Sequence, residues 1–189
     1  MEQKRIVIFA SGSGTNAENI ISYFADNEQV VIDSLWSNKV DAFALKRADK
    51  FGIETHVFDR EKFYHSSNII DTLRKRKVDL IVLAGFLWLI PENLIKNFTI
   101  INIHPALLPK YGGKGMYGMN VHKAVVENGD EKSGISIHFV NEKYDDGKLI
   151  FQAECEIKPG DSPEKVAEKV HELEYKHFPV VIEQVLQNK

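Results

Sequence analysis

Short apolar runs alternate with stretches of helical spacing along most of the chain. The predicted strands are 5–10, 30–36, 53–58, 79–84 and one that starts at Ile100. The predicted helices are one that reaches about Ala25, then 40–51 and 66–77. Strands and helices that alternate at these lengths predict right-handed βαβ units and a doubly wound parallel sheet.

The C-terminal part of the chain has a different pattern. The runs 134–140 and 149–157 alternate apolar and polar residues, and their short connection requires antiparallel pairing. Ser162 and Pro163 then begin a long helix, which Pro179 is expected to kink or split. The predicted fold class is α/β: a Rossmann-like, doubly wound, mostly parallel sheet with an antiparallel C-terminal strand pair and a long C-terminal helix, in a single domain, 1–189.

Composition excludes several classes of protein. The 189 residues carry a net charge of -3 with no long run of one sign, so no nucleic-acid partner is expected. Cys155 is the one cysteine, which excludes an internal disulfide, provides no metal-ligand cluster and is expected to lie in the core. No signal peptide is expected, and no apolar run reaches the roughly 18 residues that a membrane helix needs. A cytoplasmic protein without a membrane partner is therefore expected.

A turn of small residues, 11–17, joins the first strand to the first helix. Such a turn lets a phosphate or another anion approach the helix amides at Gly14, Thr15 and Asn16. It also matches a loose dinucleotide fingerprint, but this needs a carboxylate after the second strand, and Asp33 lies inside that strand. A purely structural turn is the third interpretation.

Asn102 and His104 lie at the end of an apolar run, just before Pro105. Side chains two apart on a strand point to the same face, and the carboxyl end of a parallel strand is where α/β sheets bind ligands. An amide that can donate to an oxyanion and an imidazole that can move a proton would then lie side by side. The alternative is that both are hydrogen-bonded turn residues.

Two further segments have open interpretations. Gly85 ends the fourth strand, and the five large apolar residues 86–90 either fill the core or form the wall of a pocket for a flat aromatic ligand. The glycine-rich segment 110–120 is a candidate lid beside the strand that carries His104.

The motif Asn102-Ile103-His104-Pro105-Ala106-Leu107-Leu108-Pro109 is followed downstream by His138-Phe139-Val140 and Asp145. This combination resembles the phosphoribosylglycinamide formyltransferase family, folate-dependent enzymes of purine synthesis. The resemblance covers nearly the whole chain and implies the formyltransferase fold. It includes 11–16, 37–39, 83–86, 127–130 and 160–162.

The resemblance implies individual roles. The catalytic residues would be Asn102, His104 and Asp145. The phosphate and ribose of glycinamide ribonucleotide (GAR) would be held by Gly14, Thr15, Asn16 and Glu174. The co-substrate 10-formyltetrahydrofolate would contact Leu87, Trp88, Leu89, Ile90 and Asn102. No metal is implied, and the partners would be these small molecules, with a monomer or homodimer as the assembly.

The implied reaction moves the formyl group of 10-formyltetrahydrofolate to the amine of GAR, giving formyl-GAR and tetrahydrofolate. Asn102 would donate a hydrogen bond to the oxyanion. Protonated His104 would stabilise the oxyanion and protonate the departing folate nitrogen. Asp145 is expected to raise the pKa of His104, because a nearby carboxylate favours the imidazolium.

The chain departs from the family pattern at some positions. Where many relatives have Asp-Gly-Gly, it has Asp145-Asp146-Gly147, so Asp146 is a second candidate for the acidic role. Trp88 stands where some relatives have arginine. An arginine that meets the folate tail in some relatives has no clear match here, and the residues near it are Arg60, Tyr64 and His65.

Three other functions remain open. A formyltetrahydrofolate hydrolase usually has an extra N-terminal domain, for which the strand beginning at Arg5 leaves no room. Formylation of methionyl-tRNA would need a C-terminal nucleic-acid-binding domain, and the chain ends at Lys189. A non-catalytic nucleotide- or folate-binding module could keep the Gly14 turn without needing the three catalytic residues.

Overall fold

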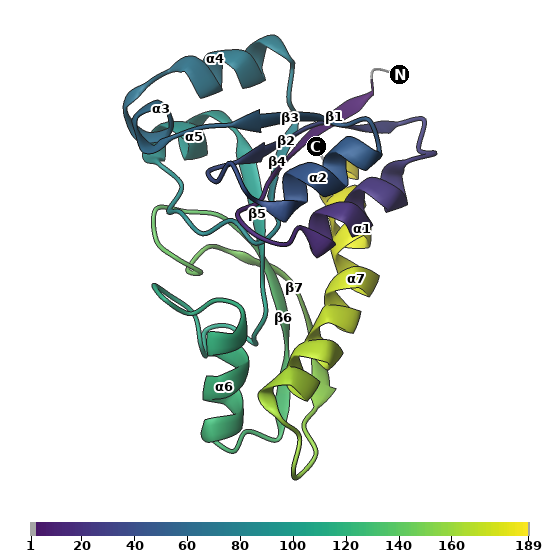
Figure 1. The fold of residues 1–189 in the computed structure, drawn as a ribbon, viewed down its shortest axis with the longest axis vertical. Coiled ribbons are helices and arrows are strands. Elements are labelled where there is room, and N and C mark those ends of the chain that lie inside the picture. Colours follow the sequence, from purple (N-terminus) through teal and green to yellow (C-terminus); the bar gives the residue numbers. More distant parts are fainter. Residues whose placement is uncertain (1–2, 189) are drawn as a thin grey trace.

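The computed structural model describes residues 3–188, in which one or two helices separate successive strands as far as β5 (Figure 1). The strands are β1 (Lys4–Phe9), β2 (Val30–Ser37), β3 (Glu54–Val57), β4 (Leu80–Leu83), β5 (Thr99–His104), β6 (Lys132–Phe139) and β7 (Leu149–Glu156). The helices are α1 (Thr15–Phe24), α2 (Phe43–Lys50), α3 (Arg60–His65), α4 (Asn68–Lys75), α5 (Glu92–Asn97), α6 (Met119–Glu127) and α7 (Pro163–Gln187).

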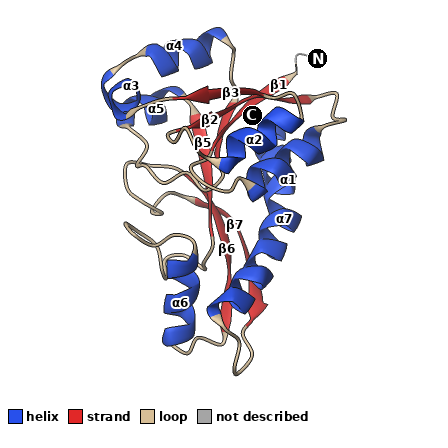
Figure 2. Ribbon diagram, viewed as in Figure 1, coloured by secondary structure: helices blue, strands red, loops and turns tan. Residues whose placement is uncertain are grey.

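All seven strands form one sheet in the order β3-β2-β1-β4-β5-β6-β7. Pairing is parallel from β3 to β5, whereas β6 pairs antiparallel with both β5 and β7. The predicted fold class is confirmed, including the antiparallel C-terminal strand pair. Helices flank the sheet on both sides (Figure 2). Across residues 3–188, no helix combines the length and apolar character needed to cross a membrane.

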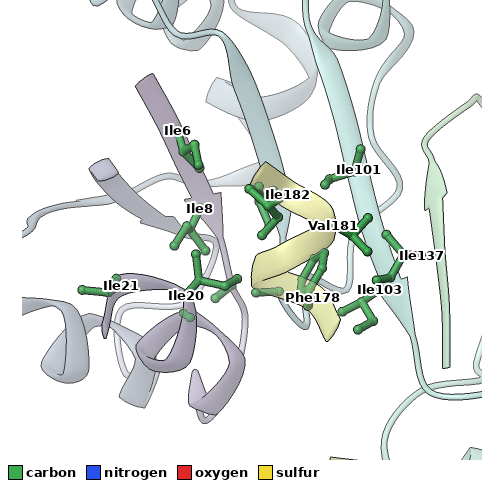
Figure 3. Close-up of a cluster of buried hydrophobic side chains, with 14 of the residues drawn as sticks. Ile6, Ile8, Ile20, Ile21, Ile101, Ile103, Ile137, Phe178, Val181 and Ile182 are labelled. Carbon is green, nitrogen blue, oxygen red and sulfur yellow. The ribbon is translucent and has the colours of Figure 1, made fainter. Parts of the chain in front are cut away.

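The alternation of side chains along each strand divides the core in two. On β1, Ile6 and Ile8 face the helices α1 and α7, while Val7 and Phe9 face the other side of the sheet, where α3, α4 and α5 pack. Figure 3 shows the first cluster, in which Phe178, Val181 and Ile182 of α7 lie between strand and helix isoleucines. Burial on both faces explains why the central strands are almost wholly apolar.

Helix α7 begins as expected but continues further than expected. The Ser162 hydroxyl accepts a hydrogen bond from the Lys165 amide at 3.3 Å, and Pro163 occupies the first turn. The predicted split at Pro179 is wrong: α7 runs through it for 25 residues. Pro179 is buried beside Phe178, and core packing on both sides of it outweighs the lost backbone hydrogen bond.

The sequence did not predict helix α3. Its first turn is capped by Asp59, whose carboxylate accepts from the Lys62 amide at 2.8 Å. Within α3 only Phe63 is buried, so six residues contain too little apolar repetition to indicate a helix. Cys155 is half-buried and packs against the core, as expected.

Candidate active site

A cavity of about 620 Å³ lies at the carboxyl ends of β1, β4 and β5. Its wall is formed by three segments that follow these strands: 12–16, 83–90 and 102–105. Residues 113–118, the end of β6 and the turn at 143–145 also border it, as do side chains from α6 and α7. The sequence elements singled out above therefore meet in a single cavity.

The small-residue turn needs glycine at one particular position. Gly14 has a φ of 75°, and a Cβ atom there would lie 2.5 Å from the Cα and Cβ atoms of Ala44. The close approach of α2 is fixed by the Ala44 amide, which donates to the Gly12 carbonyl at 3.1 Å. The turn thus begins helix α1 at the edge of the cavity, and the first amides of a helix have no partner within the helix, an arrangement suited to an anion.

Replacing Gly14 by alanine is expected to lower the free energy of unfolding by about 2 kcal/mol or more, because it adds backbone strain to a clash with Ala44. Gly12→Ala is the matched control, since a Cβ at Gly12 meets no atom within 4 Å. Denaturant unfolding of both variants measures the difference. Equal stability of the two would contradict this account of the turn.

Hydrogen bonds of Ser11 connect the segments that follow β1, β2 and β4. The buried Ser11 hydroxyl donates to Asn38 Oδ1 at 2.7 Å and accepts from the Leu87 amide at 3.0 Å. A dinucleotide site would require a carboxylate after the second strand. The candidate residue, Asp33, lies inside β2 and forms ion pairs with Arg5 and Arg76. The described structure therefore does not support the dinucleotide interpretation.

Asn102, His104 and Asp145 meet at one side of the cavity. His104 Nδ1 lies 3.5 Å from one oxygen of Asp145, and Asn102 Nδ2 lies 3.4 Å from the other. The Gly113 amide donates to Asp145 at 2.9 Å. Asp145 has a φ of 54°, so the turn after β6 holds it in a left-handed conformation to bring it here. Asp146, the second candidate acid, is exposed, does not border the cavity and faces Lys143.

His138 is a fourth polar residue of this group, and the sequence analysis assigned it no role. It is buried at the end of β6, directly opposite Asn102 on β5, and its Nε2 lies 3.1 Å from Asn102 Nδ2. His138 Nδ1 is 2.8 Å from the Phe139 carbonyl, which can only accept, so the neutral ring carries its proton on Nδ1. Its Nε2 then accepts from Asn102 and orients that amide.

Asp145 raises the pKa of His104, as expected, but it is not the largest effect. Burial lowers this pKa, and the raising effects of Asp145 and of the Tyr111 carbonyl do not compensate, so the net shift is downward rather than upward. His104 Nε2 lies 2.7 Å from the Tyr111 carbonyl, which places the proton of the neutral ring on Nε2. Burial by itself would raise the pKa of Asp145, but the nearby His138, His104 and Gly113 amide lower it, so this carboxyl stays ionised.

A second polar group borders the cavity near the Gly14 turn. Glu174 on α7 is 5% exposed and accepts a hydrogen bond from Asn16 Nδ2 at 2.8 Å. Burial raises the pKa of Glu174 to about 7, although the hydrogen bond from Asn16 opposes this.

Two histidines that the sequence did not predict as site residues, His171 and His122, also border the cavity. The three-residue spacing of His171 and Glu174, which places both on one helix face, was an available signal.

The apolar segment 87–90 lines the cavity instead of filling the core entirely. Ile90 is buried, while Leu87, Trp88 and Leu89 are half-buried along the wall. The Arg60 guanidinium lies 4.9 Å from the centre of a Trp88 ring, so a positively charged side chain packs against this apolar segment.

Comparison with known proteins identifies the class. Residues 4–182 match the model of the formyl transferase family, and the chain belongs to this family. It is 42% identical over 190 residues to the chloroplastic phosphoribosylglycinamide formyltransferase of Arabidopsis thaliana, covering 95% of this chain and 64% of that relative. It is 38% identical over 186 residues to the phosphoribosylglycinamide formyltransferase of Haemophilus influenzae, covering 95% of this chain and 85% of the relative.

Solved structures agree with these relatives. The crystal structure of phosphoribosylglycinamide formyltransferase from Anaplasma phagocytophilum superposes with a TM-score of 0.87 at 31% identity, covering 100% of this chain and 88% of that one. The resemblance drawn from the sequence motifs is confirmed. The chain spans 64% of the length of the plant relative, so the shared region is a part of that longer protein.

Proposed function

We propose that this protein transfers the formyl group of 10-formyltetrahydrofolate to the amine of GAR, a step of purine synthesis. The observation that carries the proposal is the single cavity in which the Gly14 turn, the Asn102–His104–Asp145 group and the apolar wall 87–90 meet. The names of the relatives point to the same reaction.

The two substrates would enter the cavity from different sides. The phosphate of GAR would bind the amides of Gly14, Thr15 and Asn16 at the beginning of α1. The ribose hydroxyls would reach Glu174, which Asn16 orients. The flat ring system of the folate would lie along the wall 87–90, so that its formyl group arrives at Asn102.

The chemistry follows from the side chains around Asn102. The GAR amine attacks the formyl carbon, and the carbonyl oxygen becomes an oxyanion to which Asn102 Nδ2 donates. His104 in its protonated form also stabilises the oxyanion and then protonates the folate nitrogen as the carbon–nitrogen bond breaks. The proton that the amine loses passes to Asp145, directly or through water. No covalent intermediate with the protein is required.

Transfer from 10-formyltetrahydrofolate, followed by folate absorbance with and without GAR, tests the proposal. Release of tetrahydrofolate is expected only when GAR is present, with formyl-GAR formed in equal amount. Release at the same rate without GAR would identify a hydrolase. Folate binding without release under either condition would identify a non-catalytic binding module.

A further inference from the structure

His122 is a buried polar side chain to which the reaction above gives no role. It lies on α6 next to Val121, is 1% exposed and borders the cavity. Its Nδ1 atom is enclosed and has no hydrogen-bond partner in the part of the chain that the structure describes. Because buried polar atoms are nearly always paired, an unpaired imidazole beside a cavity indicates that a ligand supplies the partner.

The surroundings of His122 leave its ring uncharged. The ring of His171 meets it edge-on, with centroids 6.4 Å apart and planes at 85°. Burial, together with the charges of His171 and His104, lowers the pKa of His122 to about 4. At neutral pH the ring therefore offers one N–H donor and one acceptor nitrogen.

His122 lies near both polar groups of the cavity. The charge of His104 acts on it. It also contacts His171, whose Nε2 is 4.0 Å from Glu174. His122, His104 and Glu174 all border the same cavity, so a ligand that contacts both polar groups has His122 nearby.

GAR has one polar group at the corresponding place. An amide joins its glycine unit, which carries the reacting amine, to the ribose. With the amine at His104 and the ribose at Glu174, this amide falls beside His122. The amide N–H is an uncharged donor, and the uncharged imidazole offers it an acceptor without the cost of burying a charge.

We propose that His122 is a substrate-binding residue whose unprotonated ring nitrogen accepts a hydrogen bond from the amide N–H of GAR. This inference rests on the proposed function and extends it by naming the residue that recognises the amide of GAR. His122 binds neither the phosphate nor the folate, so its effect is confined to one substrate.

His122→Leu is the decisive variant, because it removes the acceptor while keeping an apolar side chain of similar size. The KM for GAR is expected to rise about tenfold, the usual effect of losing one hydrogen bond to a substrate, with little change in kcat or in the KM for the folate. The melting temperature is expected to stay the same or rise, because an unpaired buried polar group has been removed. His122→Asn, which keeps a polar side chain, should recover part of the loss.

Val121→Ala is the matched control on the same turn of α6. It removes buried apolar atoms next to His122, so it should lower the melting temperature and leave the KM for GAR unchanged. An analogue of GAR in which a methylene group replaces the amide N–H completes the test. It should bind the wild type about tenfold more weakly than GAR and bind His122→Leu as well as GAR does.

The outcomes separate this inference from the proposed function. If the wild type formylates GAR but His122→Leu keeps the wild-type KM for GAR, the role of His122 is wrong and the function stands. Equal rises in both KM values with a lower melting temperature would also overturn the inference, because they indicate a disturbed fold. If the wild type does not formylate GAR, the proposed function fails and the inference fails with it.

Discussion

Replacing His104 by alanine is expected to reduce kcat/KM for formyl transfer by about 100-fold or more, the usual effect of losing an acid–base group that also stabilises an oxyanion. In the proposed reaction His104 supplies the proton that is donated to the folate nitrogen. Asn102 still donates to the oxyanion, so activity should fall strongly without being abolished. Initial rates with saturating GAR and varied folate measure the loss.

The control for this variant is His177→Ala, since His177 is a half-buried histidine on α7 that does not border the cavity. It should keep wild-type rates. Melting curves of the two variants show whether the fold survives the removal of the buried His104 ring. Near-wild-type turnover by His104→Ala would exclude its proposed role.

Asp145→Asn is expected to lower kcat/KM by about 100-fold or more as well. The change removes the charge and keeps the shape of the side chain. Asparagine also tolerates the left-handed φ of 54° at this position, so the turn should fold normally. The remaining activity should respond to pH, because the charge of Asp145 is the strongest influence that raises the pKa of His104.

The direction of that pH effect follows from the charge. Without Asp145 the pKa of His104 falls further below its ordinary value, so the imidazolium is lost at a lower pH. Since the proposed reaction needs protonated His104, the alkaline limb of the kcat/KM profile should move to lower pH in Asp145→Asn. A limb that stays in place would mean that the titrating group is not His104.

Asp146→Asn is the control that separates the two neighbouring acids. The Asp146 carboxylate is exposed, lies 3.8 Å from Lys143 Nζ and does not border the cavity. Its replacement should change kcat/KM by less than about twofold, as expected for an exposed charge away from the site. A loss as large as that of Asp145→Asn would show that the acidic role is shared.

The sequence alone predicted the features that depend on local pattern. Apolar runs identified the strands, and the spacing of small residues identified the turn at Gly14. Asn102 and His104 could be placed together because they lie two residues apart on one strand, and a strand has a fixed period. Helix α3 was missed because Phe63 is its one buried side chain, and a single position has no period.

Only the tertiary structure decided how distant segments combine and what their combination does to the chemistry. It placed Asp145 beside His104, His138 against Asn102, and Glu174 against Asn16 across 158 positions of sequence. It continued α7 through Pro179, and it buried His104 deeply enough that the net shift of its pKa is downward despite the raising effect of Asp145. Local pattern determines the elements because neighbouring residues share one backbone, whereas burial and the contacts between elements arise only when the whole chain is packed.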